Sequence, residues 1–433
     1  MINKKFKNLN LFITNSIFAF SILIMIFTRS FVGIRFFGFR LGELMVGFGL
    51  LIILIFLISQ IFLSKKFEFF PTNYYLLLLV SFFVSLFINK GDLFNLYTFK
   101  SSSYLWMVGY VIIGYFFFSN FVFNKVHIYI LTTIPYIVYI FNSGNYPNII
   151  IDFFNKFSDK FQFNKGSDVL MVLIFCLFVL KNKFEQDINY LNYTNISFFL
   201  LLPLFLTLSR ASFFAALLFL VLFNLYLMDV VKQNKKKYFI CLLLGILFFI
   251  ISAIRLAALP DLESRSDEPV VLQVVSGSVS EVAQRKNTFQ FLGFYLCEDR
   301  ICAKDNTLDW RFDIWFDLVQ DQVSKNKLLI GFGFNEIFEV MKDPQAPGRL
   351  GRDGLNEHVH NHIFTIIGRF GLLGLFLYFL FQYKLIREFR YDLVLFLVPL
   401  FLVSMIDTTM ESIQFPYLYY FLIGYYLNSL SKK

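Results

Sequence analysis

Three of the four histidines in the chain lie in one short segment, N-E-H-V-H-N-H, as His358, His360 and His362. An imidazole changes its charge near working pH, so a general acid or base is the first chemistry that this segment suggests. Two other interpretations stay open: three alternating histidines could share one metal ion, or the cluster could be a wet surface without chemistry. The segment stands where a polar loop meets a long apolar run, and this position favours catalysis.

Arginines near apolar runs form the second candidate group. Arg210 lies in T-L-S-R-A-S between two apolar runs, and Arg311 lies in a stretch with two tryptophans. A guanidinium at lipid depth is costly and usually marks a functional site, and its planar fork suits phosphate oxygens. Arg349 and Arg352 come shortly before the histidines. Several arginines beside a histidine predict a phosphate-bearing substrate.

Two carboxylates and two cysteines complete the candidates. Asp407 and Glu411 flank T-T-M, where they could orient a sugar hydroxyl, pair with an arginine or simply face solvent. Cys297 and Cys302, in C-E-D-R-I-C, are close enough to bridge in an oxidising compartment, or they stay free thiols. The pair supplies too few ligands for a metal. No Walker loop, dinucleotide glycine motif or nucleic-acid-binding pattern accompanies them.

The composition indicates which elements must position these residues. Hydrophobic residues make up 57% of the chain and charged residues only 16%, against about 25% charged in a soluble domain. A soluble fold could not cover so much apolar surface, whereas helices that cross a bilayer leave it to lipid. The net charge of +9 arises because Lys and Arg gather between apolar runs, so it predicts no nucleic-acid partner.

About twelve apolar stretches are long enough to cross a bilayer, which takes about 20 residues each. The predicted spans are residues 9–27, 41–63, 72–89, 103–120, 127–143, 167–181, 195–209, 211–229, 238–257, 361–382, 392–407 and 414–430. Lys and Arg at every second junction predict that both termini are cytoplasmic. The outer junctions also carry lysines, such as Lys165, which are expected to contact lipid headgroups. The predicted fold class is an all-α, multi-pass integral protein of a bacterial inner membrane.

One long segment interrupts the succession of spans. The sequence divides into residues 1–257 with nine spans, a large extracytoplasmic loop at 258–360, and residues 361–433 with the last three spans. Within the loop, residues 309–325 place apolar side chains and two tryptophans at helical spacing. This stretch predicts an amphipathic helix that rests along the membrane interface.

The histidine and arginine motifs resemble those of a known family. The run from His360 to Gly374 reads His-Asn, nine residues, then G-x-x-G, and resembles the H-N-x9-G-x-x-G signature of the O-antigen ligase and polymerase superfamily. S-R-A-S around Arg210 resembles that family's Ser-Arg-small motif. Residues 310–315 and the run G-F-G-F-N at 331–335 resemble its R-x3-W and G-x-G-x-N motifs. The resemblance covers residues 195–380, and three motifs in the right order make it fairly specific.

The resemblance implies a GT-C-like glycan transferase that needs neither a metal nor another cofactor. Such enzymes take a glycan from an undecaprenyl-pyrophosphate carrier in the bilayer and move it to an acceptor hydroxyl at the periplasmic face. The acceptor is a lipid A–core sugar in ligases and another carrier-linked glycan in polymerases. The completeness of the His-Asn-x9-Gly pattern favours a ligase, with a polymerase as the alternative.

The same resemblance implies roles for individual residues. His360 matches the family's proposed base, which the arginines would keep neutral, and Arg210 and Arg311 match its pyrophosphate-binding arginines. Asp407 corresponds to an acidic residue late in the family. The accessory candidates are His358, His362, Asn361, Arg349 and Arg352. The sequence departs from the family at Arg369, where small or acidic residues are common, and at Thr408.

Two functions of other classes compete with the transferase. A transporter or flippase for a lipid-linked glycan would also need many spans and arginines at membrane depth. Transporters, however, often show inverted repeats and helices broken at mid-membrane, whereas the polar residues here collect at the outer surface. A non-catalytic assembly subunit, with the loop as its docking domain, is the second competitor.

Overall fold

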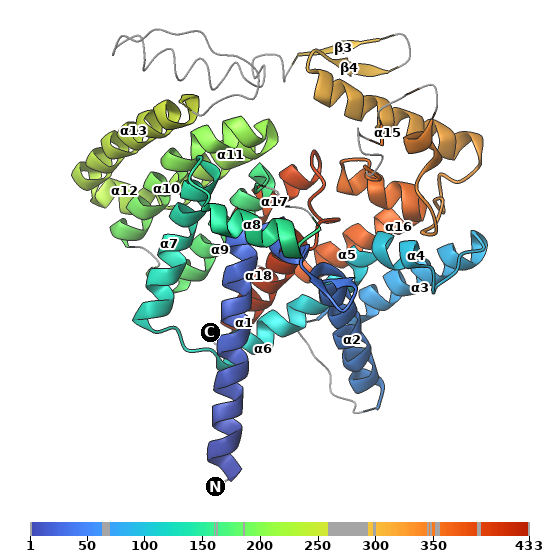
Figure 1. Ribbon diagram of the computed structural model, residues 1–433, viewed down its shortest axis with the longest axis horizontal. Helices are drawn as coiled ribbons and strands as arrows, with labels where there is room; N and C mark the ends of the chain where they lie inside the picture. Colours follow the sequence, from blue (N-terminus) through green and yellow to red (C-terminus); the bar gives the residue numbers. More distant parts are fainter. Residues whose placement is uncertain are drawn as a thin grey trace.

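The structure, a computed structural model, is built almost entirely from helices (Figure 1). It describes residues 2–62, 70–159, 161, 163–184, 187–258, 293–297, 300–343, 346, 349–350, 356–387 and 391–431. The helices are α1 (Ile2–Val32), α2 (Leu41–Phe62), α3 (Thr72–Ile88), α4 (Leu96–Ser101), α5 (Ser103–Trp106), α6 (Tyr110–Asn120), α7 (Lys125–Asn142), α8 (Asn148–Phe157), α9 (Gly166–Phe184), α10 (Ile188–Leu208), α11 (Arg210–Tyr226), α12 (Met228–Gln233), α13 (Lys235–Ala257), α15 (Asn306–Ser324), α16 (His362–Arg387), α17 (Tyr391–Ser404) and α18 (Gln414–Ser431). The 3-10 helices in the described residues are η1 (Met107–Gly109) and η3 (Glu339–Lys342).

The strands in the described residues form two small antiparallel hairpins. Strand β1 (Arg35–Phe36) pairs with β2 (Phe39–Arg40), and β3 (Phe294–Leu296) pairs with β4 (Ile301–Ala303). Hairpins this short cannot provide a core of their own. The hydrophobic core is therefore made by helices, as the composition predicts.

Each predicted span coincides with a helix or with successive helices over most of its described residues. Among the described residues, five helices are long and apolar enough to cross a membrane by length and composition: Phe12–Val32, Leu41–Phe62, Ile188–Leu208, Lys235–Ala257 and His362–Arg387. On α2 and α13 large apolar side chains stay exposed, for example Ile55 and Leu243, as lipid-facing residues do. The predicted helical membrane fold is confirmed in this sense, and the count of twelve crossings stays a prediction.

Helix α9 lies in the middle of the bundle. Every side chain from Ser167 to Lys181 is buried, and α7, α10, α11, α17 and α18 all pack against this helix. A helix that is apolar all round is expected only where other helices surround it. Its N-terminal end is thereby held next to the loops that connect the neighbouring helices, and the candidate site is built there.

The long polar loop contributes α15 and the hairpin β3–β4, which lie together at the edge of the molecule away from the N-terminus (Figure 1). Helix α15 confirms the amphipathic helix predicted at 309–325, with Ile314, Leu318 and Gln322 buried along one face. This face packs against η3 and the segment before α16. Protein therefore covers it, which corrects the expectation that it rests on the membrane. Residues 259–292 lie outside the described residues, and the domain limits stay predictions.

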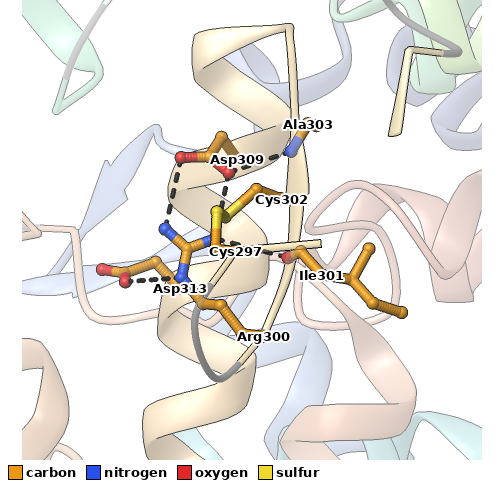
Figure 2. The surroundings of a disulfide bond; sticks show 7 residues. All are labelled: Cys297, Arg300, Ile301, Cys302, Ala303, Asp309 and Asp313. Carbon is orange, nitrogen blue, oxygen red and sulfur yellow. Dashed lines mark hydrogen bonds and ion pairs between the residues drawn. A yellow bond between two sulfur atoms is a disulfide. The ribbon is translucent and has the colours of Figure 1, made fainter. Parts of the chain in front are cut away.

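The hairpin β3–β4 fixes the beginning of α15. A disulfide joins Cys297 to Cys302, so these residues are not free thiols here (Figure 2). Arg300, in the turn, forms ion pairs with Asp309 at 2.9 Å and with Asp313 at 3.3 Å, both on the first turns of α15 (Figure 2). The hairpin is thus anchored on the stretch of helix that carries the predicted pyrophosphate-binding arginine.

A break in α16 anchors the other end of the loop. Gly371 has a φ of 69° and Gly331, in the G-F-G-F-N run, has a φ of 71°, both in the region that favours glycine. The two backbones run against each other, and the N–H of Phe332 donates to the carbonyl of Gly368 at 2.8 Å. A Cβ at either glycine would collide with the opposing backbone. The motif glycines therefore dock the loop that carries α15 onto the helix that follows the histidines.

Candidate active site

His360 lies in a short segment that is held firmly on both sides. The indole N–H of Trp315 donates to the carbonyl of Val359 at 2.6 Å. Asn361 caps α16, because its side-chain oxygen accepts hydrogen bonds from two N–H groups of the first turn. Its amide also donates to the carbonyl of Met405 at 2.6 Å. Asn361, predicted as an accessory residue, therefore positions the segment between α15, α16 and the loop after α17.

His360 is both strained and incompletely paired. Its φ of 55° lies in a region that costs a residue with a side chain about 1–3 kcal/mol. Its Nε2 lies 2.9 Å from Oδ1 of Asn356, and its ring meets the ring of Trp310 edge to face at 5.2 Å. Its Nδ1 is buried and finds no hydrogen-bond partner among the described residues. Buried nitrogens are nearly always paired, so such an exception is typical of a place where a substrate group binds.

The surroundings of His360 keep its ring neutral. Burial is the main cause that lowers the pKa of His360 to about 3, and the positive charges of Arg311 and Lys165 lower it further. The nearby carboxylate of Asp407 opposes this shift without cancelling it. At physiological pH the imidazole is therefore uncharged and able to accept a proton.

The other two histidines of the cluster lie in different surroundings. His362 is buried, with Nδ1 3.1 Å from Oε1 of Glu411 and Nε2 3.0 Å from the hydroxyl of Tyr378. His358 lines a small cavity with Lys100 and Glu411, with room for about one water molecule. Burial lowers the pKa of His358 to about 4. Among the described residues, no group of three or more His, Cys, Asp or Glu side chains is placed to hold a metal ion.

Arg210 is the first residue of α11, and Ser209 caps this helix. The Nη1 atom of Arg210 lies 2.5 Å from Oδ2 of Asp305, and less than a tenth of either side chain is exposed. Asp305 in turn caps α15 by accepting the N–H of Leu308 at 2.9 Å. The pair joins the first residues of α11 and α15. An anion that binds Arg210 must share it with Asp305 or displace that carboxylate.

Arg311 lies on α15, next to the Trp310 that contacts His360. Its Nε is buried and has no hydrogen-bond partner among the described residues. Burial lowers the pKa of Arg311, while the charges of Asp407 and Asp305 act against this shift. An arginine with an unused donor in a buried position is suited to bind an incoming anion.

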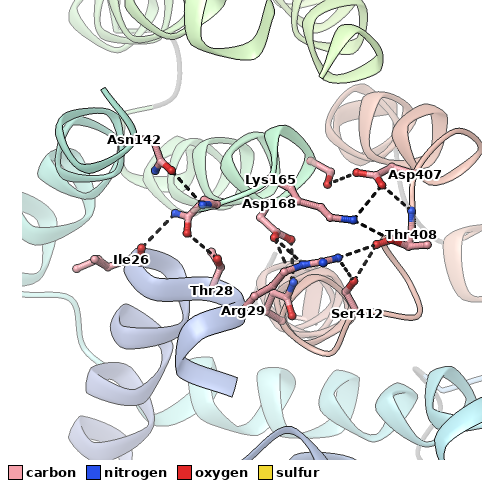
Figure 3. A network of polar contacts seen from close by, with 12 residues as sticks. Ile26, Thr28, Arg29, Asn142, Lys165, Asp168, Asp407, Thr408 and Ser412 are labelled. Atoms are coloured by element: carbon pink, nitrogen blue, oxygen red, sulfur yellow. Dashed lines mark hydrogen bonds and ion pairs between the residues drawn. The ribbon is translucent and has the colours of Figure 1, made fainter. Parts of the chain in front are cut away.

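Asp407 is the centre of a buried polar network (Figure 3). Its two oxygens accept hydrogen bonds from Lys165 at 3.3 Å and from the hydroxyl of Ser167 at 2.8 Å, and Lys165 also donates to Thr408 at 3.0 Å. Burial raises the pKa of Asp407, but Lys165 and Arg311 outweigh burial and hold that pKa well below its usual range. The carboxylate is therefore ionised, and the interpretation of Asp407 as an ordinary solvated residue is wrong. So is the expected headgroup contact of Lys165, which points inward.

Arg29 adds a second cation that sequence reasoning did not select. Helix α1 kinks at Thr28, where φ is 40°, and Arg29 follows the kink. Arg29 donates to the hydroxyl of Ser412 at 2.8 Å and lies 3.7 Å from Asp168 (Figure 3). A usable signal was present for Arg29 and Lys165, since both fall on the predicted outer side, where the positive-inside rule expects few cations.

The remaining arginine candidates have structural partners. Arg349 is buried and forms ion pairs with Asp313 at 2.5 Å and with Asp317, and so ties the segment after η3 to α15. Arg369 donates to two carbonyls of the loop after α15 at 2.6 and 3.1 Å. Arg352 lies outside the described residues. Neither Arg349 nor Arg369 has its charge directed toward His360.

Four of the predicted site residues come together from separate parts of the chain. The charges of Arg210, Arg311 and Asp407 act on one another or on His360, although the four residues belong to α11, α15 and two different connecting loops. Lys165 joins them. A neutral base among cations suits a reaction in which a hydroxyl loses a proton while a phosphate gains negative charge.

Comparison with known protein families agrees with this geometry. Residues 196–379 match the family model described as O-antigen ligase. The matched stretch contains Arg210, Arg311 and His360, whereas Lys165 and Asp407 lie outside it. No curated protein matches the chain. The match and the apolar helices together support a membrane glycan transferase of the ligase or polymerase type.

Proposed function

We propose that the chain, whose residues 196–379 match the O-antigen ligase family, is a member of the O-antigen ligase and polymerase superfamily and transfers a glycan from undecaprenyl pyrophosphate to an acceptor hydroxyl. We propose an O-antigen ligase, whose acceptor is a sugar of the lipid A–core, with its active site at the periplasmic face of a bacterial inner membrane. The complete H-N-x9-G-x-x-G run from His360 to Gly374 supports the ligase. A polymerase, whose acceptor is another carrier-linked glycan, is the alternative and would use the same residues.

The observation that carries the proposal is the unpaired Nδ1 of His360. This nitrogen is buried beside the cations Arg311 and Lys165, in a ring that stays neutral. An unsatisfied buried acceptor costs about 1–3 kcal/mol, and a donor from the substrate would remove that cost. The hydroxyl of the acceptor sugar is such a donor.

The reaction then follows from the positions of base and cations. His360 takes the proton of the acceptor hydroxyl as the hydroxyl oxygen attacks the anomeric carbon of the donor glycan. The bond from that carbon to the phosphate oxygen breaks, and the pyrophosphate leaves with the electron pair and one additional negative charge. Arg210 and Arg311 stabilise this charge, and the proton leaves His360 for water afterwards.

The cations do most of the electrostatic work in this mechanism. A fixed donor directed at the developing charge contributes about 3 kcal/mol, or roughly a hundredfold in rate. Lys165 pairs with Asp407 and Arg29 lies beside Asp168, so these two cations offset the negative charge of the two carboxylates. Asp407 holds Lys165 in place and can accept a hydrogen bond from a hydroxyl of a bound sugar.

The test is glycan profiling of a deletion strain that carries the wild-type gene, His360→Ala or Arg210→Ala. We expect wild type to restore long glycan on the lipid core, and both variants to fail at normal membrane levels. Carrier-linked long chains with an unmodified core in the deletion strain support the ligase, and a single-repeat ladder supports the polymerase. Full complementation by both variants would overturn the proposed site and favour transport or assembly.

A further inference from the structure

Asn356 contacts His360 in one defined orientation. The side-chain N–H2 of Asn356 donates to the carbonyl of Arg349 at 2.9 Å, and its backbone N–H donates to the carbonyl of Leu350 at 2.7 Å. A carbonyl can only accept a hydrogen bond, so the amide nitrogen must face Arg349. The amide oxygen then faces Nε2 of His360 at 2.9 Å.

This orientation determines where the proton of the ring lies. An amide oxygen has no hydrogen to give, so Nε2 of His360 must carry the proton of the neutral ring. The lone pair then lies on Nδ1, the nitrogen that finds no partner among the described residues. With the opposite tautomer, two acceptors would face each other at Nε2.

Arg349 holds Asn356 in turn. Its guanidinium is fixed by Asp313 and Asp317 on α15 and donates to the carbonyl of Val340 at 2.9 Å. The carbonyl that orients the amide of Asn356 therefore belongs to a buried, charge-paired residue. The carboxylates of α15 therefore orient the amide of Asn356 indirectly, by holding Arg349 in place.

We propose that Asn356 is a positioning residue which fixes the tautomer of His360, so that Nδ1 is the atom that accepts the proton of the substrate hydroxyl. The proposal on the tautomer stands on geometry alone, and its catalytic consequence rests on the proposed function. Four titratable groups act on the ring: the charged Arg311 from α15, Lys165 from just before α9 and Asp407 from the loop after α17, and the imidazole of His358 from the same segment. None of them forms a hydrogen bond with either ring nitrogen, so they tune the pKa of the ring without choosing its tautomer.

Nitrogen NMR of histidine-labelled protein in nanodiscs tests the tautomer directly. The chain has only four histidines, and His360→Ala identifies the signals of this ring. We expect a protonated Nε2 and an unprotonated Nδ1 for His360 in wild type, and a mixture of tautomers in Asn356→Ala. A protonated Nδ1 in wild type would overturn the proposal. The signals of His362, whose ring has other partners, should not move.

Two variants separate the tautomer role from a role in holding the loop. Asn356→Asp keeps an acceptor facing Nε2 but loses the donor to Arg349, whereas Asn356→Ala loses both. We expect Asn356→Ala to lower kcat on the order of a hundredfold with KM little changed, and Asn356→Asp to recover most of this loss, since wrong tautomers are costly in other catalytic histidines. Asn356→Asp should also raise the pKa of His360, so that its rate falls at a higher pH on the acid side than that of wild type.

The outcomes distinguish the proposal from the proposed function. If Asn356→Asp is as impaired as Asn356→Ala, the residue only holds the loop and the proposal is wrong. If His360→Ala keeps full activity while wild type shows the expected tautomer, the assigned base is wrong and the geometric assignment still holds. If Asn356→Ala does not fold, Asn356→Asp and the wild-type spectrum still decide.

Discussion

His360 and His362 are two residues apart, yet the structure treats them in opposite ways. His362 is a helical residue whose two ring nitrogens are satisfied by Glu411 and Tyr378. His360 has a positive φ, one nitrogen paired with Asn356 and one unpaired, in a buried and cationic setting. Full pairing is typical of a residue that stabilises the fold, and strain with an unpaired polar atom is typical of a functional residue.

The arginines divide in the same manner. Arg349 and Arg369 donate to carboxylates and carbonyls that the loop and helices supply, and so they join elements of the fold. Among the described residues Arg311 keeps an unused Nε in the site, and Arg210 is paired with the carboxylate of Asp305 at the point where α11 and α15 begin. What separates the two groups is the direction of the guanidinium, which residue type and spacing do not reveal.

The largest effect should come from His360. We expect His360→Ala to lower the transfer rate by about 10²–10⁴-fold, the usual contribution of a positioned base, because the variant loses the buried Nδ1 that would accept the proton. His127→Ala is the matched control, since His127 caps α7 in a different part of the chain. Equal transfer rates for the two variants, at equal amounts of protein in the membrane, would contradict the assignment of His360 as the base.

The second largest effect should come from Arg311, and it tests the distinction between arginines that bind substrate and arginines that hold the fold. Arg311→Lys keeps the charge but loses the fork, and Arg311→Ala loses both; we expect roughly a hundredfold loss for Ala and a smaller loss for Lys. The transfer rates are measured with purified protein and a donor that carries a radioactive glycan. Arg387→Ala, at the exposed end of α16, is the control. Equal loss in the control would mean that arginine removal harms the membrane protein in general.

A third change tests the electrostatic setting of His360. Lys165→Met removes one of the charges that lower the pKa of His360, so this pKa should rise from about 3. Wild type should show no acid limb from His360 between about pH 5 and 8, whereas the variant should lose rate as the pH falls at a higher pH than wild type. Lys156→Met, on the exposed side of α8, should leave the profile unchanged. An unchanged profile in Lys165→Met contradicts the charge coupling.

The smallest effect on chemistry should come from His362. His362→Phe removes a hydrogen-bond partner of the Glu411 carboxylate and one of the partners of the Tyr378 hydroxyl, which costs about 1–3 kcal/mol of stability. We expect a lower melting temperature and less protein in the membrane, while the rate per folded molecule stays near that of wild type. A large loss of rate at unchanged stability would make His362 a catalytic residue and remove the contrast with His360.

The sequence predicts the helices well for physical reasons, and it selects site candidates that the structure brings together, while their roles stay predictions. Apolar runs of span length have few alternatives to helices in a bilayer, and helical spacing reveals the buried face of α15 at Ile314, Leu318 and Gln322. His360, Arg210, Arg311 and Asp407 are recognisable because charged or titratable residues are rare beside such runs. The motif glycines are recognisable too, and the structure explains Gly331 and Gly371 by the close approach of two backbones.

Contacts between distant parts of the chain are what the sequence does not predict. Lys165 and Asp407 are 242 positions apart in the chain, and nothing in either local sequence indicates that they meet. The same holds for Asp305, which neutralises Arg210 only because α11 and α15 begin side by side. The covered face of α15 is a third case, because an amphipathic pattern predicts a buried face without naming what covers it.

The most direct test of the central claim uses purified protein in nanodiscs with an undecaprenyl-pyrophosphate-linked glycan and a lipid A–core acceptor. The measurement is the release of undecaprenyl pyrophosphate together with the glycan gained by the acceptor, for wild type and His360→Ala. The account predicts equal amounts of both products for wild type and neither for the variant, with donor binding retained in both. Product formation by His360→Ala at the wild-type rate would contradict it.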